Sequence, residues 1–242
     1  MIDLHCHILP RFDDGSVSLE ESLLMARMAV NSGVRTIVST SHFPGRFDSL
    51  QRMPLLLEKF QILQDALAQE KLNLQLLPGA EILCLPETAA LARQKELPTI
   101  GDSDYILVEF FFNESSSFMN QQLQELAELG YRPIVAHPER YKAVQINPEL
   151  PRSWFRSGYV IQLNKGSLLG SFGPLAQDAS EIILREGLAH VIASDAHGSR
   201  VRTPHMGSLL HWLRNHCDPE YAEVLMVRNP ARIIANQDVV PV

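Results

Sequence analysis

The chain has 242 residues, a length typical of one large α/β domain or of two small domains. Its 45% hydrophobic content is enough for a substantial core. Its formal net charge of −7 argues against a general surface that binds nucleic acid or an anionic membrane. No stretch approaches the roughly 18 apolar residues that span a bilayer, and no secretory signal follows Met1. Cys6, Cys84 and Cys217 are odd in number and form no C-x-x-C pair, so we expect a protein of the reducing cytoplasm.

The first strand-like run is followed directly by two histidines. If residues 2–4 form a short buried strand, His5 and His7 leave its end on the same face, because side chains at i and i+2 of a strand point the same way. Two imidazoles that converge from a rigid element suit a transition-metal ion. A single H-x-H pair is also common on protein surfaces, so a metal site requires further ligands elsewhere in the chain.

The rest of the chain alternates between strand-like and helical runs. Ser18-Leu19-Glu20-Glu21 forms a capping box, which predicts a helix that begins there and ends before Gly33. Runs of apolar and β-branched residues predict strands, in chain order, at 2–4, 34–39, 74–77, 105–108, 133–136, 159–163 and 190–193. Later helices are predicted at about 55–69, 86–98, 118–129, 151–156 and 175–186, with more helices from about residue 204.

Seven strand runs that alternate with helices predict βα units and a parallel sheet. No linker or change in composition divides the chain, so we expect a single domain over residues 1–242. An open doubly wound sheet would fit this alternation as well. A closed α/β barrel is favoured because almost every strand carries a candidate ligand at its carboxyl end, and a closed ring brings those ends around one point.

The candidate ligands are five histidines and four carboxylates. They are His5, His7, Asp14, His42, Glu81, Glu109, His137, Asp195 and His197. Nine mixed nitrogen and oxygen ligands are too many for one structural zinc ion and suit two or three ions bridged by carboxylates. Three divalent ions, four carboxylates and a bridging hydroxide leave a small positive charge for an anionic substrate. The site therefore predicts metal-assisted hydrolysis of a phosphoester; manganese, iron, cobalt, zinc and magnesium all fit such ligands.

Some of these assignments have close competitors. Asp13 precedes Asp14 in the same turn, and we favour Asp14 before Gly15 while Asp13 stays an alternative. His190 begins a strand, at the end of a barrel where residues serve stability, so we leave it out of the site. We expect His211 and His216 to lie on a surface helix, outside the site. Whether His205 lines the site stays open.

Arginine binds phosphate oxygens with two parallel hydrogen bonds. Arg140 follows the candidate ligand His137, and Arg202 follows His197, so both are candidates for the phosphate site. Arg200 is close enough in sequence to be the functional residue in place of Arg202. Two further arginines flank ligand loops and could shape the rim of the site: Arg11 and Arg46.

The ordered motifs H-x-H, D-D-G, S-T-S-H, P-G-A-E, V-E-F, A-H-P-E-R-Y and S-D-A-H resemble the polymerase-and-histidinol-phosphatase (PHP) superfamily. More narrowly, the chain resembles the bacterial manganese-dependent protein tyrosine phosphatases of capsule and exopolysaccharide biosynthesis, the CpsB/YwqE type. The resemblance extends from Met1 to Asn229-Pro230. The chain departs from it at 43–47 and at 200–204, where Arg200 is an additional arginine.

The resemblance implies a distorted (β/α)7 barrel of the PHP type with three divalent ions, manganese first among them. It implies three ligand sets: His5, His7, Glu81 and Asp195; Glu81, Glu109 and His137; Asp14, His42 and His197. It also implies that Arg140 and Arg202 bind the phosphate, and that a metal-bridging hydroxide attacks it. The implied substrate is phosphotyrosine, notably in the tyrosine-rich tail of a polysaccharide-assembly kinase.

Three alternatives to this function differ in how well they fit the sequence. A cysteine-based tyrosine phosphatase needs an arginine that is separated from its cysteine by five residues. No cysteine of this chain has one, so we reject this alternative. A small phosphomonoester such as histidinol phosphate, or a nucleic-acid phosphodiester, could be the substrate, although the acidic chain disfavours nucleic acid. A non-catalytic binding module with structural metals is disfavoured because structural sites are closed.

Overall fold

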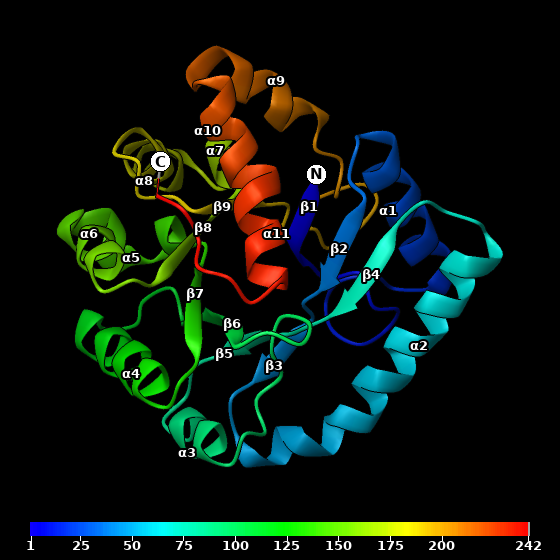
Figure 1. The fold of residues 1–242 in the computed structure, drawn as a ribbon, viewed down its shortest axis with the longest axis horizontal. Helices are drawn as coiled ribbons and strands as arrows, with labels where there is room; N and C mark the ends of the chain where they lie inside the picture. The colour runs from blue at the N-terminus through cyan, green and yellow to red at the C-terminus, as the bar shows by residue number, and fades with distance from the viewer. Residues whose placement is uncertain (242) are drawn as a thin grey trace.

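The computed structural model describes residues 1–241 and centres on two parallel β-sheets surrounded by helices (Figure 1). The first sheet has the order β1 (Ile2–Cys6), β2 (Thr36–Ser39) and β4 (Gln75–Pro78). The second has the order β3 (His42–Pro44), β5 (Glu81–Leu83), β6 (Tyr105–Glu109), β7 (Arg132–Ala136), β8 (Val160–Asn164) and β9 (Val191–Ala193). Every pair of neighbouring strands in residues 1–241 is parallel. The α/β class and the parallel pairing predicted from the sequence are confirmed.

The number of strand segments differs from the prediction of seven. β2 and β3 are separated only by Thr40 and Ser41, and β4 and β5 only by Gly79 and Ala80, so the chain passes from one sheet to the other at both places. Gly79 is required there because a Cβ atom would lie 2.6 Å from Val38 Cγ1. The segments β3 and β5 are three residues long and contain polar or proline residues, which is why sequence patterns did not indicate them.

Hydrogen bonds also join the carboxyl ends of the first and last strands. The backbone N–H of Asp195 donates to the carbonyl of His5 over 2.8 Å, and the N–H of His7 donates to the carbonyl of Ala196 over 2.8 Å. Cys6 and Ala196 form a parallel bridge. The segment that follows β9 is thereby fixed against the end of β1.

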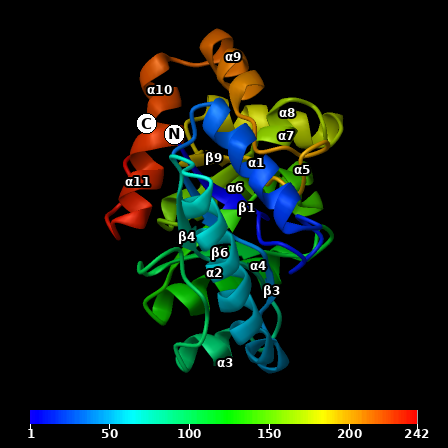
Figure 2. The same cartoon turned by 90° about the vertical axis from the view of Figure 1, so that its right-hand side faces the viewer.

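The predicted helices are present, although α3 (Thr88–Arg93) ends at Arg93 and not near residue 98. Ser18 caps α1 (Leu19–Asn31), and its side chain accepts a hydrogen bond from the N–H of Glu21, as in a capping box. The others are α2 (Met53–Gln69), α3 (Thr88–Arg93), α4 (Ser116–Glu128), α6 (Glu149–Arg156), α8 (Pro174–Arg185), α9 (Gly207–His216), α10 (Pro219–Glu223), a π-helical turn η3 (Val224–Arg228) and α11 (Asn229–Ile234). Figure 2 shows α1 and α2 on the outside of β4 and its neighbours.

Four short helical segments were not predicted, because none is long enough to show helical periodicity. They are η1 (Phe47–Arg52), η2 (Pro138–Arg140), α5 (Lys142–Ile146) and α7 (Lys165–Leu168). No helix in residues 1–241 has the length and apolar character needed to cross a membrane.

Alternate residues of the strands contribute to two separate apolar clusters. In β6, Ile106 belongs to the large cluster that includes the helices, whereas Tyr105 belongs to a smaller cluster among the strands. Tyr105, Val160 and Val191 are the first residues of their strands and share the smaller cluster with Ile233 of α11. Because α11 packs at the amino ends of the strands, their carboxyl ends are left for the polar side chains.

His190 is buried at the amino end of β9, outside the polar cluster described below. Its ring stacks on Phe155 at 5.1 Å, and its Nδ1 accepts the N–H of Ile161 over 3.1 Å. Burial lowers the pKa of His190 to about 4, whereas an unfolded histidine has a pKa of about 6.5. Folding therefore favours the neutral ring. The resulting stability is complete above the unfolded pKa and is lost as the pH falls toward 4.

We expect lowering the pH from about 7.5 to about 5 to cost the native protein about 2 kcal/mol of unfolding free energy through His190. The variant His190→Asn should lose that pH-dependent part, since an amide oxygen can accept the Ile161 N–H and does not titrate. Urea unfolding of both proteins with chelator at the two pH values measures the difference. Equal pH dependence in the two proteins would contradict the assignment.

Candidate metal centre

The structure brings all nine predicted ligand residues into one polar cluster at the carboxyl ends of the strands. They form four overlapping groups, and the ligand atoms of each group lie within 4.8 Å of one another. The groups are His7, Asp14, His42 and His197; His5, His7 and Glu81; His5, His137 and Asp195; and His42, Glu81 and Glu109.

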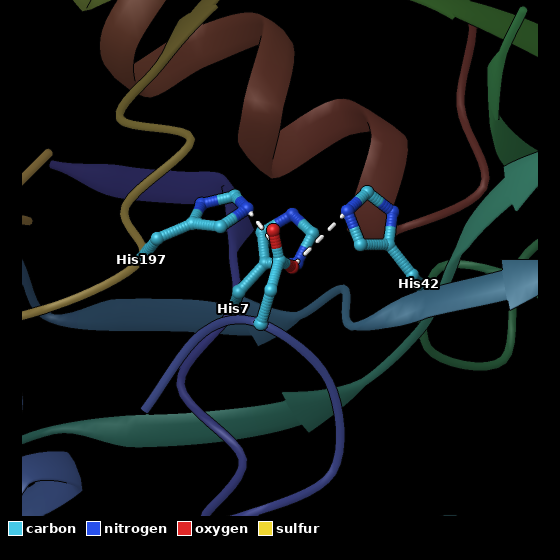
Figure 3. A group of neighbouring side chains, drawn as sticks. His7, His42 and His197 are labelled. Carbon is cyan, nitrogen blue, oxygen red and sulfur yellow. Dashed lines mark ion pairs between the residues drawn. The ribbon is translucent and has the colours of Figure 1, made fainter. Parts of the chain in front are cut away.

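Different parts of the chain place these side chains. His5 lies in β1 and His7 directly follows it, while His42 and Glu81 begin β3 and β5 and face each other in the strand register. Asp14 lies in the turn between β1 and α1. The other four ligands end β6 or follow β7 and β9: Glu109, His137, Asp195 and His197. Figure 3 shows the rings of His7, His42 and His197 converging from three separate segments.

Glu81 is the centre of the cluster and is only 1% exposed. Its Oε1 lies 3.2 Å from His5 Nε2 and 2.8 Å from His137 Nε2. Its Oε2 lies 3.2 Å from His7 Nε2 and 3.1 Å from His42 Nδ1. Burial alone would raise the pKa of Glu81, but the imidazoles around it, His5 above all, hold that pKa well below its usual range. The carboxylate is therefore an anion shared among four rings.

Three oxygen atoms contact the Nδ1 atoms of His5, His7 and His197 and so orient these rings. Gln162 Oε1 lies 2.9 Å from His5 Nδ1, Asp13 Oδ2 lies 2.8 Å from His7 Nδ1, and the carbonyl of Asp195 lies 3.1 Å from His197 Nδ1. With the proton on Nδ1, each ring donates to this oxygen and directs the lone pair of Nε2 into the cluster. Such outer partners fix the tautomer and orientation of metal ligands.

Gln162 was not among the residues singled out from the sequence. It is fully buried in the middle of β8, and its Nε2 donates to the carbonyl of Leu163 over 2.7 Å. The available signal was an amide inside the otherwise apolar run 159–163. Asn164 was also missed: its Nδ2 donates to Asp195 Oδ2 over 2.5 Å.

The two adjacent aspartates have different environments. Asp13 Oδ2 accepts from His7 and from the backbone N–H of His42 over 2.9 Å, and Asp13 belongs to none of the ligand groups. Asp14 Oδ1 instead lies 3.3 Å from His42 Nε2 and 3.5 Å from His197 Nε2. Gly15 follows because a Cβ there would lie 2.3 Å from the carbonyl oxygen of His7. This geometry favours Asp14 as a ligand and Asp13 as the partner of a ligand.

Protons compete with cations for these imidazoles. Burial alone would lower the pKa of both His7 and His42, but hydrogen bonds to neighbouring carboxylates outweigh it. They raise the pKa of His7 to about 9 and that of His42 to about 11. A bound ion must displace these protons, so metal affinity is expected to rise with pH.

Two arginines reach the cluster from the loops that were predicted to carry them. Arg140 Nη1 lies 3.3 Å from Asp195 Oδ2, and Arg202 Nη2 lies 2.5 Å from the same oxygen. Both line a cavity of about 240 Å³ together with seven of the nine candidate ligands. Arg200, the alternative to Arg202, is exposed and does not line this cavity.

The other arginines and histidines of uncertain role lie outside this cavity. Arg11 Nε donates to the carbonyl of Val17, and Arg46 pairs with Asp48 over 2.7 Å. Neither arginine lines the cavity. Three histidines are exposed and belong to no ligand group within residues 1–241: His205, His211 and His216.

Three residues of the site have left-handed backbone conformations that are rare outside glycine. They are His137 with φ of 35°, Asp195 with φ of 47° and Arg202 with φ of 49°. Such strained conformations are retained where the surrounding structure holds them, often at functional sites.

Imidazoles and carboxylates gathered at the carboxyl ends of parallel strands, beside two arginines, are typical of metal-dependent phosphoester hydrolases. The chain belongs to the CpsB/CapC family of capsular polysaccharide synthesis proteins, whose family model matches residues 1–235.

Relatives of the chain support this membership along its whole length. The tyrosine-protein phosphatase YwqE of Bacillus subtilis (strain 168) is 34% identical over 239 residues, which cover 99% of this chain and 93% of YwqE. The tyrosine-protein phosphatase CpsB of Streptococcus pneumoniae is 32% identical over 243 residues, which cover 98% of this chain and 99% of CpsB.

A solved structure is also similar, with a TM-score of 0.90, 33% identity, and coverage of 100% of this chain and 97% of that chain. It comes from crystal structures of YwqE from Bacillus subtilis and CpsB from Streptococcus pneumoniae, described as unique metal-dependent tyrosine phosphatases. The resemblance to the CpsB/YwqE type that the motifs indicated is confirmed.

Proposed function

We propose that this protein is a metal-dependent protein tyrosine phosphatase. The observation that carries the proposal is the cluster of nine histidine and carboxylate side chains beside Arg140 and Arg202. The relatives named tyrosine-protein phosphatases add support from outside the site. Since the family is one of capsular polysaccharide synthesis, the proposed substrate is phosphotyrosine in the tyrosine-rich tail of a polysaccharide-assembly kinase.

The side chains of the cluster fit divalent cations. His5 Nε2 and His7 Nε2 lie only 3.2 Å apart in a fully buried setting, which suits two lone pairs directed at a common positive charge. Three ions would be held by His5, His7, Glu81 and Asp195; by Glu81, Glu109 and His137; and by Asp14, His42 and His197. Manganese is the proposed ion, and the mixed ligands also accept iron, cobalt, zinc or magnesium.

The protein's own residues would bind the phosphate and prepare its displacement. When bound, the ions would supply Lewis acidity and lower the pKa of water toward neutrality. The guanidinium groups of Arg140 and Arg202 would hold the phosphoryl oxygens and stabilise charge that develops on them. The phenolate that leaves has a pKa near 10, so we assign no general acid. Cys6 is fully buried, and burial raises the pKa of its thiol well above the usual value, so we assign it no role as nucleophile.

We also infer that the two sheets belong to one distorted seven-stranded barrel in a single domain. β2 with β3, and β4 with β5, would each be one interrupted barrel strand. The hydrogen bonds between His5, His7 and the segment 195–196 would close the ring between its first and last strands. A barrel would explain why ligands from six of its seven strands gather in one cluster.

The test of the proposed function is turnover of a phosphotyrosine peptide beside histidinol phosphate. The protein is stripped of metal, refilled with manganese, and its bound metal is counted. Manganese-dependent turnover of the peptide, with little turnover of histidinol phosphate, is the expected result. A preference for histidinol phosphate would favour a small phosphomonoesterase, and no turnover at full metal occupancy would favour a non-catalytic module.

Substitution of the two adjacent aspartates should separate a ligand from its supporting partner. We expect Asp14→Ala to reduce the number of bound manganese ions by one, because it removes a ligand atom. We expect Asp13→Ala to keep that number at saturation and to weaken metal binding by about 10–100-fold, because His7 loses its orienting partner. Calorimetric titration with elemental analysis measures both, and the reverse pattern would assign the ligand to Asp13.

A further inference from the structure

An aromatic ring that does not belong to the ligand cluster lies against both phosphate-site arginines. Phe172 is part of the segment between α7 and α8. The centroid of its ring lies 4.4 Å from Arg140 Cζ and 5.5 Å from Arg202 Cζ. The centroid of the Phe112 ring also lies 4.4 Å from Arg140 Cζ, so the Arg140 guanidinium contacts two aromatic rings.

The two arginines come from different segments and need a common support. Arg140 ends η2 and Arg202 lies in the loop after β9, so no secondary-structure element fixes one relative to the other. Asp195 Oδ2 contacts both guanidinium groups, but only at one edge of each. The Nε of Arg202 is buried without a hydrogen-bond partner within residues 1–241.

The sequence keeps space for the ring of Phe172. Gly166 in α7 packs against it, and a Cβ at this position would lie 2.6 Å from Phe172 Cε2 and 3.1 Å from its Cζ. The backbone of Gly166 does not have a positive φ. The glycine is therefore needed for the ring that packs on it and not for its backbone conformation.

We propose that Phe172 is a positioning residue that holds Arg140 and Arg202 in the orientation that binds phosphate. This inference rests on the proposed function of the same site. A ring face attracts a guanidinium and leaves the N–H groups at its edge free for hydrogen bonds. Phe172 thus orders both cations before the substrate arrives, while the reacting atoms are left to other residues.

The test measures binding of inorganic phosphate to the manganese-loaded protein by calorimetry, with metal content determined for every variant. Phe172→Leu should weaken phosphate binding on the order of tenfold, because it keeps an apolar side chain but removes the ring face. Phe172→Tyr should restore binding close to the native value. Ser171→Ala, a change in the exposed neighbour, is the control and should have no effect.

Gly166→Ala provides an independent variant that leaves Phe172 in the chain. It should weaken phosphate binding as Phe172→Leu does, because the new methyl group displaces the ring. In the Phe172→Leu background the same glycine substitution should add little, since the ring that it displaces is already absent. Full additivity of the two substitutions would contradict a shared action through the ring.

The outcomes separate this inference from the proposed function. Weaker phosphate binding in Phe172→Leu supports positioning even if the native protein fails to hydrolyse phosphotyrosine. Native phosphate binding in Phe172→Leu overturns it, as does a defect limited to the phosphotyrosine peptide, which would mean direct contact with the tyrosine ring. Failure of the native protein to bind phosphate would also overturn it, because the arginines would then have no anion to be positioned for.

Discussion

Replacing Glu81 with glutamine is expected to lower manganese-dependent hydrolysis of a phosphotyrosine peptide on the order of 10⁴-fold. Glu81 contacts four imidazoles through its two oxygens and would bridge two of the proposed ions. Glutamine has nearly the same shape but no negative charge to hold them. Each ion contributes several kcal/mol of charge stabilisation in metal-assisted hydrolysis, and a barrier higher by about 5 kcal/mol corresponds to this loss of rate.

Rate assays and elemental analysis of the same samples check this prediction. Metal content should fall together with activity, while circular dichroism should stay native. Glu87→Gln is the matched control, because Glu87 is exposed and belongs to no ligand group. An active Glu81→Gln enzyme, or an inactive one that binds all its metal, would remove Glu81 from the role of bridging ligand.

Replacing Arg202 with alanine is expected to lower kcat/KM for the same peptide by about 10²–10³-fold. The guanidinium lines the cavity beside the cluster, and removal of one donor that stabilises charge in the transition state has an effect of this size. Arg200→Ala is the matched control two residues away. Because Arg200 is exposed and outside the cavity, its removal should change kcat/KM less than about threefold, as is usual for a surface substitution.

Kinetics with both variants at equal metal content decide between the two arginines. Arg202→Lys should recover only part of the activity, because an ammonium group cannot form the paired hydrogen bonds of a guanidinium. A large defect in Arg200→Ala with near-normal Arg202→Ala would transfer the phosphate role to Arg200. Phosphate binding by the same variants would show whether the defect lies in anion binding.

Side chains with distinctive chemistry could be predicted as members of the site, whereas short strands could not. The nine residues of the cluster were found because histidine and carboxylate have distinctive ligand chemistry and recur where predicted strands end. The strands β3 and β5 were not found, since three residues that include polar or proline side chains show no strand pattern. Short segments of this kind form through pairing with neighbours that lie far away in the sequence.

The α/β class, the parallel pairing and the nine residues that gather in the cluster could be predicted from the sequence. These follow from local properties: the spacing of apolar residues, the capping box at Ser18 and the donor atoms of each side chain. The tertiary structure alone separated Asp13 from Asp14, placed Arg202 at the cavity and Arg200 outside it, and set Gln162 behind His5, 157 positions earlier in the chain. Those distinctions depend on distances of a few ångströms between residues from different strands and loops, and only the packed fold fixes such distances.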